Sequence, residues 1–186
     1  MNRKAFGIGI AGGVIVALLG LLAVGLIVAY SGGYNVAATE DHTAFSRWLL
    51  ETTMHKSVEN RAQLIATPER FTPAMIAAGA EEYRAMCEHC HAGPGVDRAG
   101  WADGMLPQPP HLTEAAAEWA PEEVFWMVKH GIKMSGMPAF GADHSDATLW
   151  HIAAFVEQLP AMTPEEYAAF GDGPAHGGDN HTGGTQ

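Results

Sequence analysis

The residues Cys87-Glu88-His89-Cys90-His91 form a C-x-x-C-H run that holds both cysteines of the 186-residue chain. Two thiols one helical turn apart can add to the two vinyl groups of a haem, and the imidazole that follows is then held beside the iron as its proximal ligand. The run therefore predicts one covalently attached haem c. Cys87 and Cys90 are the predicted attachment sites, and His91 is the predicted iron ligand.

A cysteine pair has two other known uses, as a thiol–disulfide couple or as half of a zinc site. A zinc ribbon needs a second pair of ligands, but the chain has only these two cysteines. A thioredoxin-like motif needs a strand before it, whereas the residues before Cys87 have helical spacing. Haem attachment is the prediction that the pattern favours.

The sixth ligand of the iron is predicted from the segment Met134-Ser135-Gly136-Met137-Pro138. Pro138 disfavours a helical backbone at Met137, which leaves Met137 extended with a thioether that can project inward. Met134 is the alternative ligand, and His130 or His151 could replace methionine altogether. A thioether opposite histidine raises the reduction potential and leaves the iron no vacant position for a substrate. This ligand set predicts electron transfer, not catalysis.

The pattern of apolar residues predicts an all-α fold, without strands or internal repeats. Thr72-Pro73 is expected to open a helix that continues through Met86 to the cysteines. Pro121 is expected to begin a helix that Gly131 ends. A third helix is expected from about 146 to 159, ended by Pro160. The Gly- and Pro-rich residues 93–110 have no periodicity and are predicted to form a loop.

These features resemble the class I c-type cytochromes over residues 73 to about 160. The resemblance rests on the C-x-x-C-H run and on Gly79, Tyr83, Met137-Pro138, Leu149, Trp150 and Phe155. It implies a cytochrome c fold in which the first and last helices cross near Gly79, with an aromatic residue of the last helix against that glycine. It also implies a haem edge that is exposed for electron transfer. The chain is similar to membrane-anchored cytochromes that serve respiratory chains.

The N-terminus carries an apolar stretch of 25 residues, 6–30, which is long enough to cross a bilayer core of about 30 Å. Arg3 and Lys4 precede it, so the positive-inside tendency places the N-terminus in the cytoplasm and the remaining chain in the periplasm. We expect a retained single-pass anchor in the cell inner membrane. The alternative is a signal peptide cleaved near 36–38.

Four segments are predicted: an anchor over 1–33, a linker over 34–72, a mono-haem cytochrome c domain over 73–170, and a disordered Gly- and His-bearing tail over 171–186. The linker contains an amphipathic helix near 40–62 with Phe45, Trp48, Leu49 and Thr52 on one stripe. This stripe could lie at the membrane interface, pack on a partner or cap the following domain. In the anchor, small residues recur every four positions and could dock on another transmembrane helix: Ala5, Gly9, Gly13 and Ala17.

The formal net charge of −11 argues against a nucleic-acid partner, which would require a basic surface. We expect instead a redox protein partner with a basic surface, such as a respiratory complex, an oxidase or a dehydrogenase. The predicted function is single-electron transfer at the membrane, without a small-molecule substrate or an enzymatic activity of the chain itself. The alternative function is a haem-based sensor or ligand-binding module with a labile sixth site.

Other residues have weaker assignments. Arg98 is a candidate for contact with a haem propionate, and His176 and His181 of the tail are candidates for binding metal ions. The loop over one haem face is expected to contain Trp101, Met105, Pro107, Pro109 and Pro110. Residues expected in the core are Met75, Met86, Trp119, Trp126, Met127, Trp150 and Met162.

Overall fold

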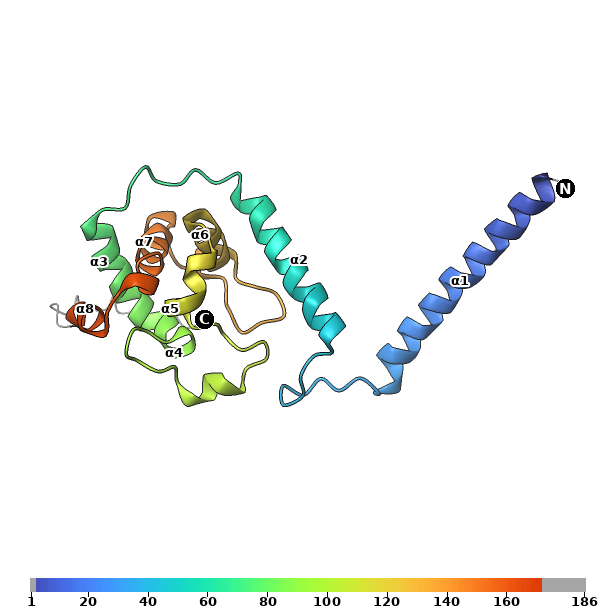
Figure 1. Cartoon of the computed structure of the whole chain (residues 1–186), viewed down its shortest axis with the longest axis horizontal. Helices are drawn as coiled ribbons and strands as arrows, with labels where there is room; N and C mark the ends of the chain where they lie inside the picture. Colours follow the sequence, from blue (N-terminus) through green and yellow to red (C-terminus); the bar gives the residue numbers. More distant parts are fainter. Residues whose placement is uncertain (1–2, 172–186) are drawn as a thin grey trace, which may run out of the picture. The chain divides into compact units, whose positions relative to one another are not determined.

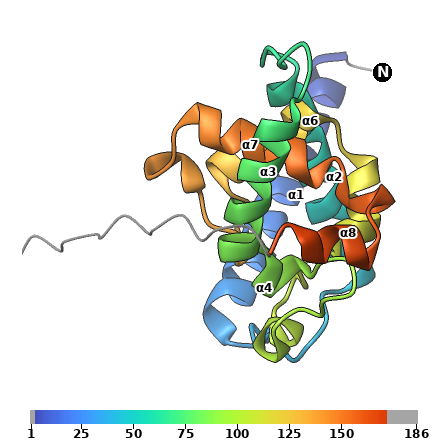
Figure 2. The same cartoon turned by 90° about the vertical axis from the view of Figure 1, so that its left-hand side faces the viewer.

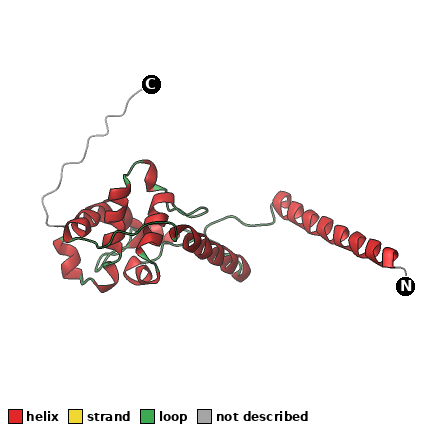
Figure 3. Cartoon of the chain, turned by 90° about the horizontal axis from the view of Figure 1, so that it is seen from above, coloured by secondary structure: helices red, strands yellow, loops and turns green. Residues whose placement is uncertain are grey.

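The computed structural model describes residues 3–171 of the chain, which are helices and connecting loops (Figure 1). Within this range there is no strand, and the only extended pairing is an isolated bridge between Gly93 and Val96 (Figure 3). The all-α prediction is therefore confirmed. The α-helices are α1 Arg3–Ser31, α2 Ala44–Ala62, α3 Pro73–Glu82, α4 Glu88–His91, α5 Leu112–Ala115, α6 Pro121–His130, α7 Asp146–Val156 and α8 Pro164–Ala169.

Shorter turns join these helices. A π-helical turn, η1 Tyr83–Cys87, connects α3 to α4. The 3₁₀ turns are η2 Gly100–Gly104, η3 Ala116–Glu118, η4 Phe140–Ala142 and η5 Leu159–Ala161.

The chain divides into two compact units, and the boundary in the sequence lies between Glu40 and Asp41. The first unit contains α1, whose residues Gly9–Ser31 have a mean hydropathy of 2.7 and no buried side chain. A helix of this length and composition fits single-pass membrane anchoring, as predicted. Gly9 and Gly13 of the predicted small-residue face lie on α1, but the side chain of Ala5 is outside the described residues. The tail beyond Gly171 is also outside them.

Local sequence explains where the helices of the second unit begin and end. The Thr72 hydroxyl accepts a hydrogen bond from the Met75 N–H, and Pro73 occupies the first helical position of α3. Ser145 caps α7 in the same way. Gly131 ends α6 with φ +65°, a left-handed conformation that a glycine adopts without strain. The predicted starts of α3 and α6 and the predicted end of α6 are confirmed.

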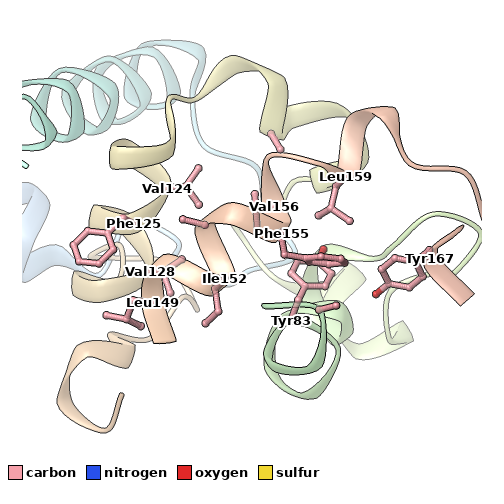
Figure 4. Packing of buried hydrophobic residues seen from close by; sticks show 13 residues of the cluster. Tyr83, Val124, Phe125, Val128, Leu149, Ile152, Phe155, Val156, Leu159 and Tyr167 are labelled. Atoms are coloured by element: carbon pink, nitrogen blue, oxygen red, sulfur yellow. The ribbon is translucent and has the colours of Figure 1, made fainter. Parts of the chain in front are cut away.

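The centre of the second unit is the crossing of α3 over α7 (Figure 2). Gly79 lies at the crossing, because a Cβ at this position would be 1.9 Å from the His151 carbonyl oxygen and 2.9 Å from Cβ of Phe155. Phe155 is fully buried, and its ring lies 5.3 Å from the ring of Tyr83 (Figure 4). The predicted contact between the first and last helices of the domain is therefore present, with Phe155 as the aromatic residue.

Replacing Gly79 with alanine is expected to destabilise the protein by about 3 kcal/mol, because the added methyl group forces the two helix backbones apart. The free energy of unfolding, measured by urea titration of the helical circular dichroism signal, would test this. Gly100→Ala is the matched control, since a Cβ there meets no atom within 4 Å. Equal stability of the two variants would contradict the close crossing.

Two helix boundaries differ from the predictions. The helix that begins at Pro73 is α-helical only to Glu82 and widens into η1 before the cysteines. The helix predicted over 146–159 ends at Val156, and Pro160 lies within η5. Proline removes a backbone donor and disfavours helix in the residue before it, so the α-helix ends before Leu159 instead of running up to Pro160.

The helix predicted near 40–62 is α2, which begins four residues later at Ala44, with Thr43 as its N-cap. The buried residues of α2 are Val58 and Ala62, which follow a different helical stripe from the predicted aromatic one. Val58 and Ala62 lie in the half of α2 that packs beside α6 (Figure 1). The C-terminal half of α2 therefore caps the domain, whereas Phe45, Trp48 and Leu49 remain exposed.

Candidate functional site

The C-x-x-C-H run follows η1 and forms the short helix α4. Cys87 is the last residue of η1, and Cys90 and His91 lie in α4. The Glu88 N–H donates to the Tyr83 carbonyl five residues earlier, which widens the turn that leads into α4. Both cysteines are free thiols, and both residues are half-buried.

Tyr83 and the loop after His91 hold this run against the core. The Tyr83 hydroxyl is buried and donates a hydrogen bond of 2.6 Å to the Ala92 carbonyl. Ala92 has φ +62°, so the chain turns sharply after α4. The Ala99 N–H then donates to the His89 carbonyl at 2.9 Å. These contacts fix both ends of α4, a helix too short to be stable alone.

Helix α8 packs on the same run from a distant part of the chain. The Tyr167 hydroxyl donates a hydrogen bond to Oε2 of Glu88. A Cβ at Gly93 would lie 2.6 Å from Cζ of Tyr167, so only glycine fits beneath this ring. The guanidinium of Arg84 covers the ring at 5.5 Å. This contact was not predicted, although Thr163-Pro164-Glu165-Glu166 contains the capping-box pattern that begins α8.

Replacing Tyr167 with phenylalanine is expected to cost about 2 kcal/mol of stability, because it removes one hydrogen bond to a carboxylate while keeping the packed ring. Chemical unfolding of the haem-loaded full chain would measure this. Tyr34→Phe is the matched control, because Tyr34 lies half-exposed before α2. A Tyr167→Phe variant as stable as the control would show that the hydrogen bond contributes nothing.

The surroundings of His91 favour a neutral imidazole with its proton on Nδ1, which is the form that binds a metal through Nε2. Its Nδ1 lies 2.9 Å from the Pro110 carbonyl, which can only accept, so Nδ1 carries the proton. Burial lowers the pKa of His91, and the nearby Arg98 and His111 lower it further against the opposing effect of the Pro110 hydrogen bond. The imidazole is therefore uncharged at neutral pH. Its Nε2 is the nitrogen left to bind iron.

The chemistry of the cysteines does not favour the thiol–disulfide or zinc alternatives. Burial raises the pKa of the Cys87 thiol to about 12, with smaller contributions from Cys90 and Glu82. A thiol used in disulfide exchange needs a lowered pKa, because the thiolate is the nucleophile. Between residues 3 and 171, no group of three or more His, Cys, Asp and Glu side chains is arranged to hold a metal ion.

The predicted axial methionine lies in a tight loop after α6. The Ile132 N–H donates to the Met137 carbonyl at 3.3 Å, and the Ser135 hydroxyl both donates to the Ile132 carbonyl and accepts from the Met137 N–H. Met137 is half-buried and packs against the core cluster. Met134 is 79% exposed, with φ +60°. The loop therefore turns Met137 toward the domain and Met134 toward solvent.

The other candidate residues occupy varied positions. His130 is exposed at the end of α6, and His151 is half-buried on α7 at the α3 crossing. Arg98 donates to the Pro109 carbonyl at 2.5 Å and lies 3.6 Å from Asp103. Arg98 thus braces the loop before His111, and contact with a propionate stays a prediction. The methionines and tryptophans expected in the core are half-buried: Met75, Met86, Trp119, Trp126, Met127, Trp150 and Met162.

The loops around the run expose apolar side chains. Val96, Trp101 and Met134 are all exposed, although their residue types favour burial. The loop that contains Trp101 and the loop that contains Met134 meet where the end of the Met105 side chain fills the space beside Gly136. Residues 93–110 form the predicted loop, whose backbone is irregular apart from η2 and the bridge from Gly93 to Val96.

A helical domain with a C-x-x-C-H run, a neutral histidine and a methionine loop defines a c-type cytochrome domain. Residues 74–156 match the family model described as cytochrome C oxidase, cbb3-type, subunit III. These residues form a cytochrome c domain of that type, which implies haem, iron and electron transport. No curated protein matches the chain. The matched residues end with α7, so α2 and α8 lie outside them.

The donor groups on this chain fit the haem that the family implies. Two reduced thiols are available one helical turn apart, and the adjacent imidazole is neutral with Nε2 free of the Pro110 hydrogen bond. A thioether is available from the Met137 loop. Thiol, imidazole and thioether are the groups that attach haem c and complete its iron coordination.

Proposed function

We propose that the chain is a membrane-tethered, mono-haem c-type cytochrome that transfers single electrons between a respiratory membrane complex or dehydrogenase and an acceptor. The observation that carries this proposal is the neutral His91, fixed through Nδ1 by the Pro110 carbonyl, beside the half-buried thiols of Cys87 and Cys90. A haem bound by these residues supplies an iron that alternates between the ferric and ferrous states.

Four side chains are proposed to hold the haem. Cys87 and Cys90 form the covalent attachment, and His91 and Met137 are the proposed axial ligands. The hydrogen bonds of Ser135 and Ile132 hold the loop that carries Met137, so that this thioether would occupy the sixth position of a bound haem iron and exclude water and small ligands from it. A closed position favours an electron carrier over a sensor or an enzyme.

The exposed Val96, Trp101 and Met134 provide the proposed contact surface for a redox partner. Apolar side chains at such a contact displace water and form the central part of an interface. The chain as a whole carries an excess of acidic groups. Of the 10 Lys and Arg residues, Arg3 and Lys4 precede the anchor, so 8 basic residues face 21 acidic ones in the remaining chain.

Placement at the membrane follows from α1. We propose that its N-terminus is cytoplasmic and that the cytochrome domain, residues 73–170, lies in the periplasm of a cell with an inner membrane. The packing of Tyr167 on Glu88 and Gly93 supports a domain that extends beyond the matched residues to the end of α8. The proposed partner is an oxidase, a dehydrogenase or another respiratory complex.

Electron transfer to the partner is expected to slow as salt increases when residues 1–33 are removed, because the free acidic carrier must then find a basic surface by diffusion. Attraction between the two is screened over about 8 Å at physiological ionic strength. The full-length protein should respond less, since its anchor raises the local concentration. Stopped-flow rates for both proteins across a salt series test this. A truncated carrier whose rate ignores salt, or rises with it, would contradict acidic docking.

A further inference from the structure

The N-terminal half of α2 carries an apolar surface that the proposed function does not use. Phe45, Trp48 and Leu49 are 68%, 59% and 45% exposed, and their i, i+3, i+4 spacing places them on one face of the helix. The rings of Phe45 and Trp48 lie 6.0 Å apart. We name these three residues the aromatic face of α2. Such a cluster is costly to leave in water, and it marks an interaction site.

The other end of α2 is firmly joined to the cytochrome domain. Val58 and Ala62 are buried, and the His55 ring stacks on Trp119 at 4.5 Å. Beyond the helix, the Thr67 hydroxyl donates to Glu122 of α6 at 2.9 Å. The aromatic face is therefore carried on a helix whose orientation is fixed relative to the domain.

The short connection between α1 and α2 limits which surfaces the aromatic face can reach. Only the 12 residues 32–43 separate the end of α1 from the start of α2. Fully extended, they span at most about 40 Å. If α1 crosses a bilayer, the first turns of α2 are always within this distance of the lipid headgroups. Tryptophan favours the headgroup region, where its ring meets apolar chains and its N–H stays near water, and phenylalanine and leucine form the buried apolar face of helices that lie at this interface.

We propose that the aromatic face of α2 inserts into the headgroup region of the bilayer that holds α1. The neighbouring charges are mixed, since Arg47 pairs with Asp41 at 3.3 Å and Glu51 is exposed. Glu51 lies two positions after Leu49, and therefore on the opposite side of the helix from Leu49. Attachment therefore arises from apolar burial, not from attraction to anionic lipid. The chain would then hold the membrane at two points, and the second point would fix the orientation of the cytochrome domain against the bilayer.

The test uses the full haem-loaded chain in nanodiscs of zwitterionic phosphatidylcholine that contain no other protein. Leu49→Cys and Glu51→Cys each add one thiol, and a charged, water-soluble maleimide measures its access to water. The unmodified chain serves as the blank: it should not react if Cys87 and Cys90 are bonded to haem, so a failure of the haem proposal is detected separately. Absorbance and circular dichroism spectra confirm that each variant is folded.

The cysteine at position 49 is expected to react at least tenfold more slowly than the cysteine at position 51, at low and at high salt. Adding Phe45→Ser and Trp48→Ser to the Leu49→Cys variant should restore fast reaction. If the cysteines at positions 49 and 51 react with the maleimide at equally fast rates in nanodiscs without other protein, the proposal is overturned. The aromatic face would then be assigned to contact with a protein partner. Slow reaction that is lost at high salt would also overturn it, because attachment would then depend on charge.

Discussion

A chain in which Cys87 and Cys90 are both replaced by alanine is expected to retain no haem on a denaturing gel, while the unmodified chain keeps its haem-dependent peroxidase stain. The reason is that both thioether bonds come from these two residues, and the chain has no third cysteine. Non-covalent binding through His91 alone does not survive denaturant. The expected loss of stain is complete, and each single variant should keep part of it through one remaining bond.

The matched control for this experiment is His89→Ala. His89 lies between the two cysteines and is exposed, and its backbone carbonyl accepts a hydrogen bond from the Ala99 N–H. The control should stain like the unmodified chain. An unmodified chain that loses its stain under denaturing conditions would refute covalent attachment.

Replacing Met137 with alanine is expected to abolish the far-red iron–sulfur charge-transfer band, lower the reduction potential and open the iron to carbon monoxide. Met137 is half-buried in a loop closed by Ser135 and Ile132, and alanine offers no ligand atom in its place. Absorbance of the ferric protein and carbon monoxide titration of the ferrous protein measure these changes. Binding should rise from none in the unmodified protein to one molecule per haem.

Met134→Ala is the matched control, because Met134 is three residues away and largely exposed. It should keep the band and resist carbon monoxide. The reverse pattern would assign the ligand to Met134. An unmodified protein that binds carbon monoxide rapidly would favour a sensor or ligand-binding module over a carrier.

The main helices of the cytochrome domain could be predicted because their boundaries depend on neighbouring residues. Thr72-Pro73 supplies a side-chain cap and a preset φ angle, and Gly131 supplies a left-handed terminus. The C-x-x-C-H run is equally local. The loss of α-helical geometry at Tyr83 could not be predicted, because the π turn follows from how Tyr83 packs under Phe155 and reaches the Ala92 carbonyl.

The role of α2 could be predicted only in part. Its helical spacing predicts a helix, but Phe45, Trp48 and Leu49 dominate its apolar pattern, so the pattern does not indicate burial of Val58 and Ala62. Those smaller residues are the buried ones, because α6 packs along the C-terminal half of the helix. The contact between Tyr167 and Glu88 joins residues 79 positions apart, so no local pattern could have indicated it.

The position of α8 has a consequence for the order in which the protein matures. Tyr167 covers Gly93 and bonds to Glu88, so α8 shields one side of the attachment run in the folded chain. During synthesis, α8 emerges after Cys87, Cys90 and His91 have already left the ribosome. Before α8 docks, the run is therefore uncovered on the side that Tyr167 occupies in the folded chain. The docking of α8 then covers that side of the run.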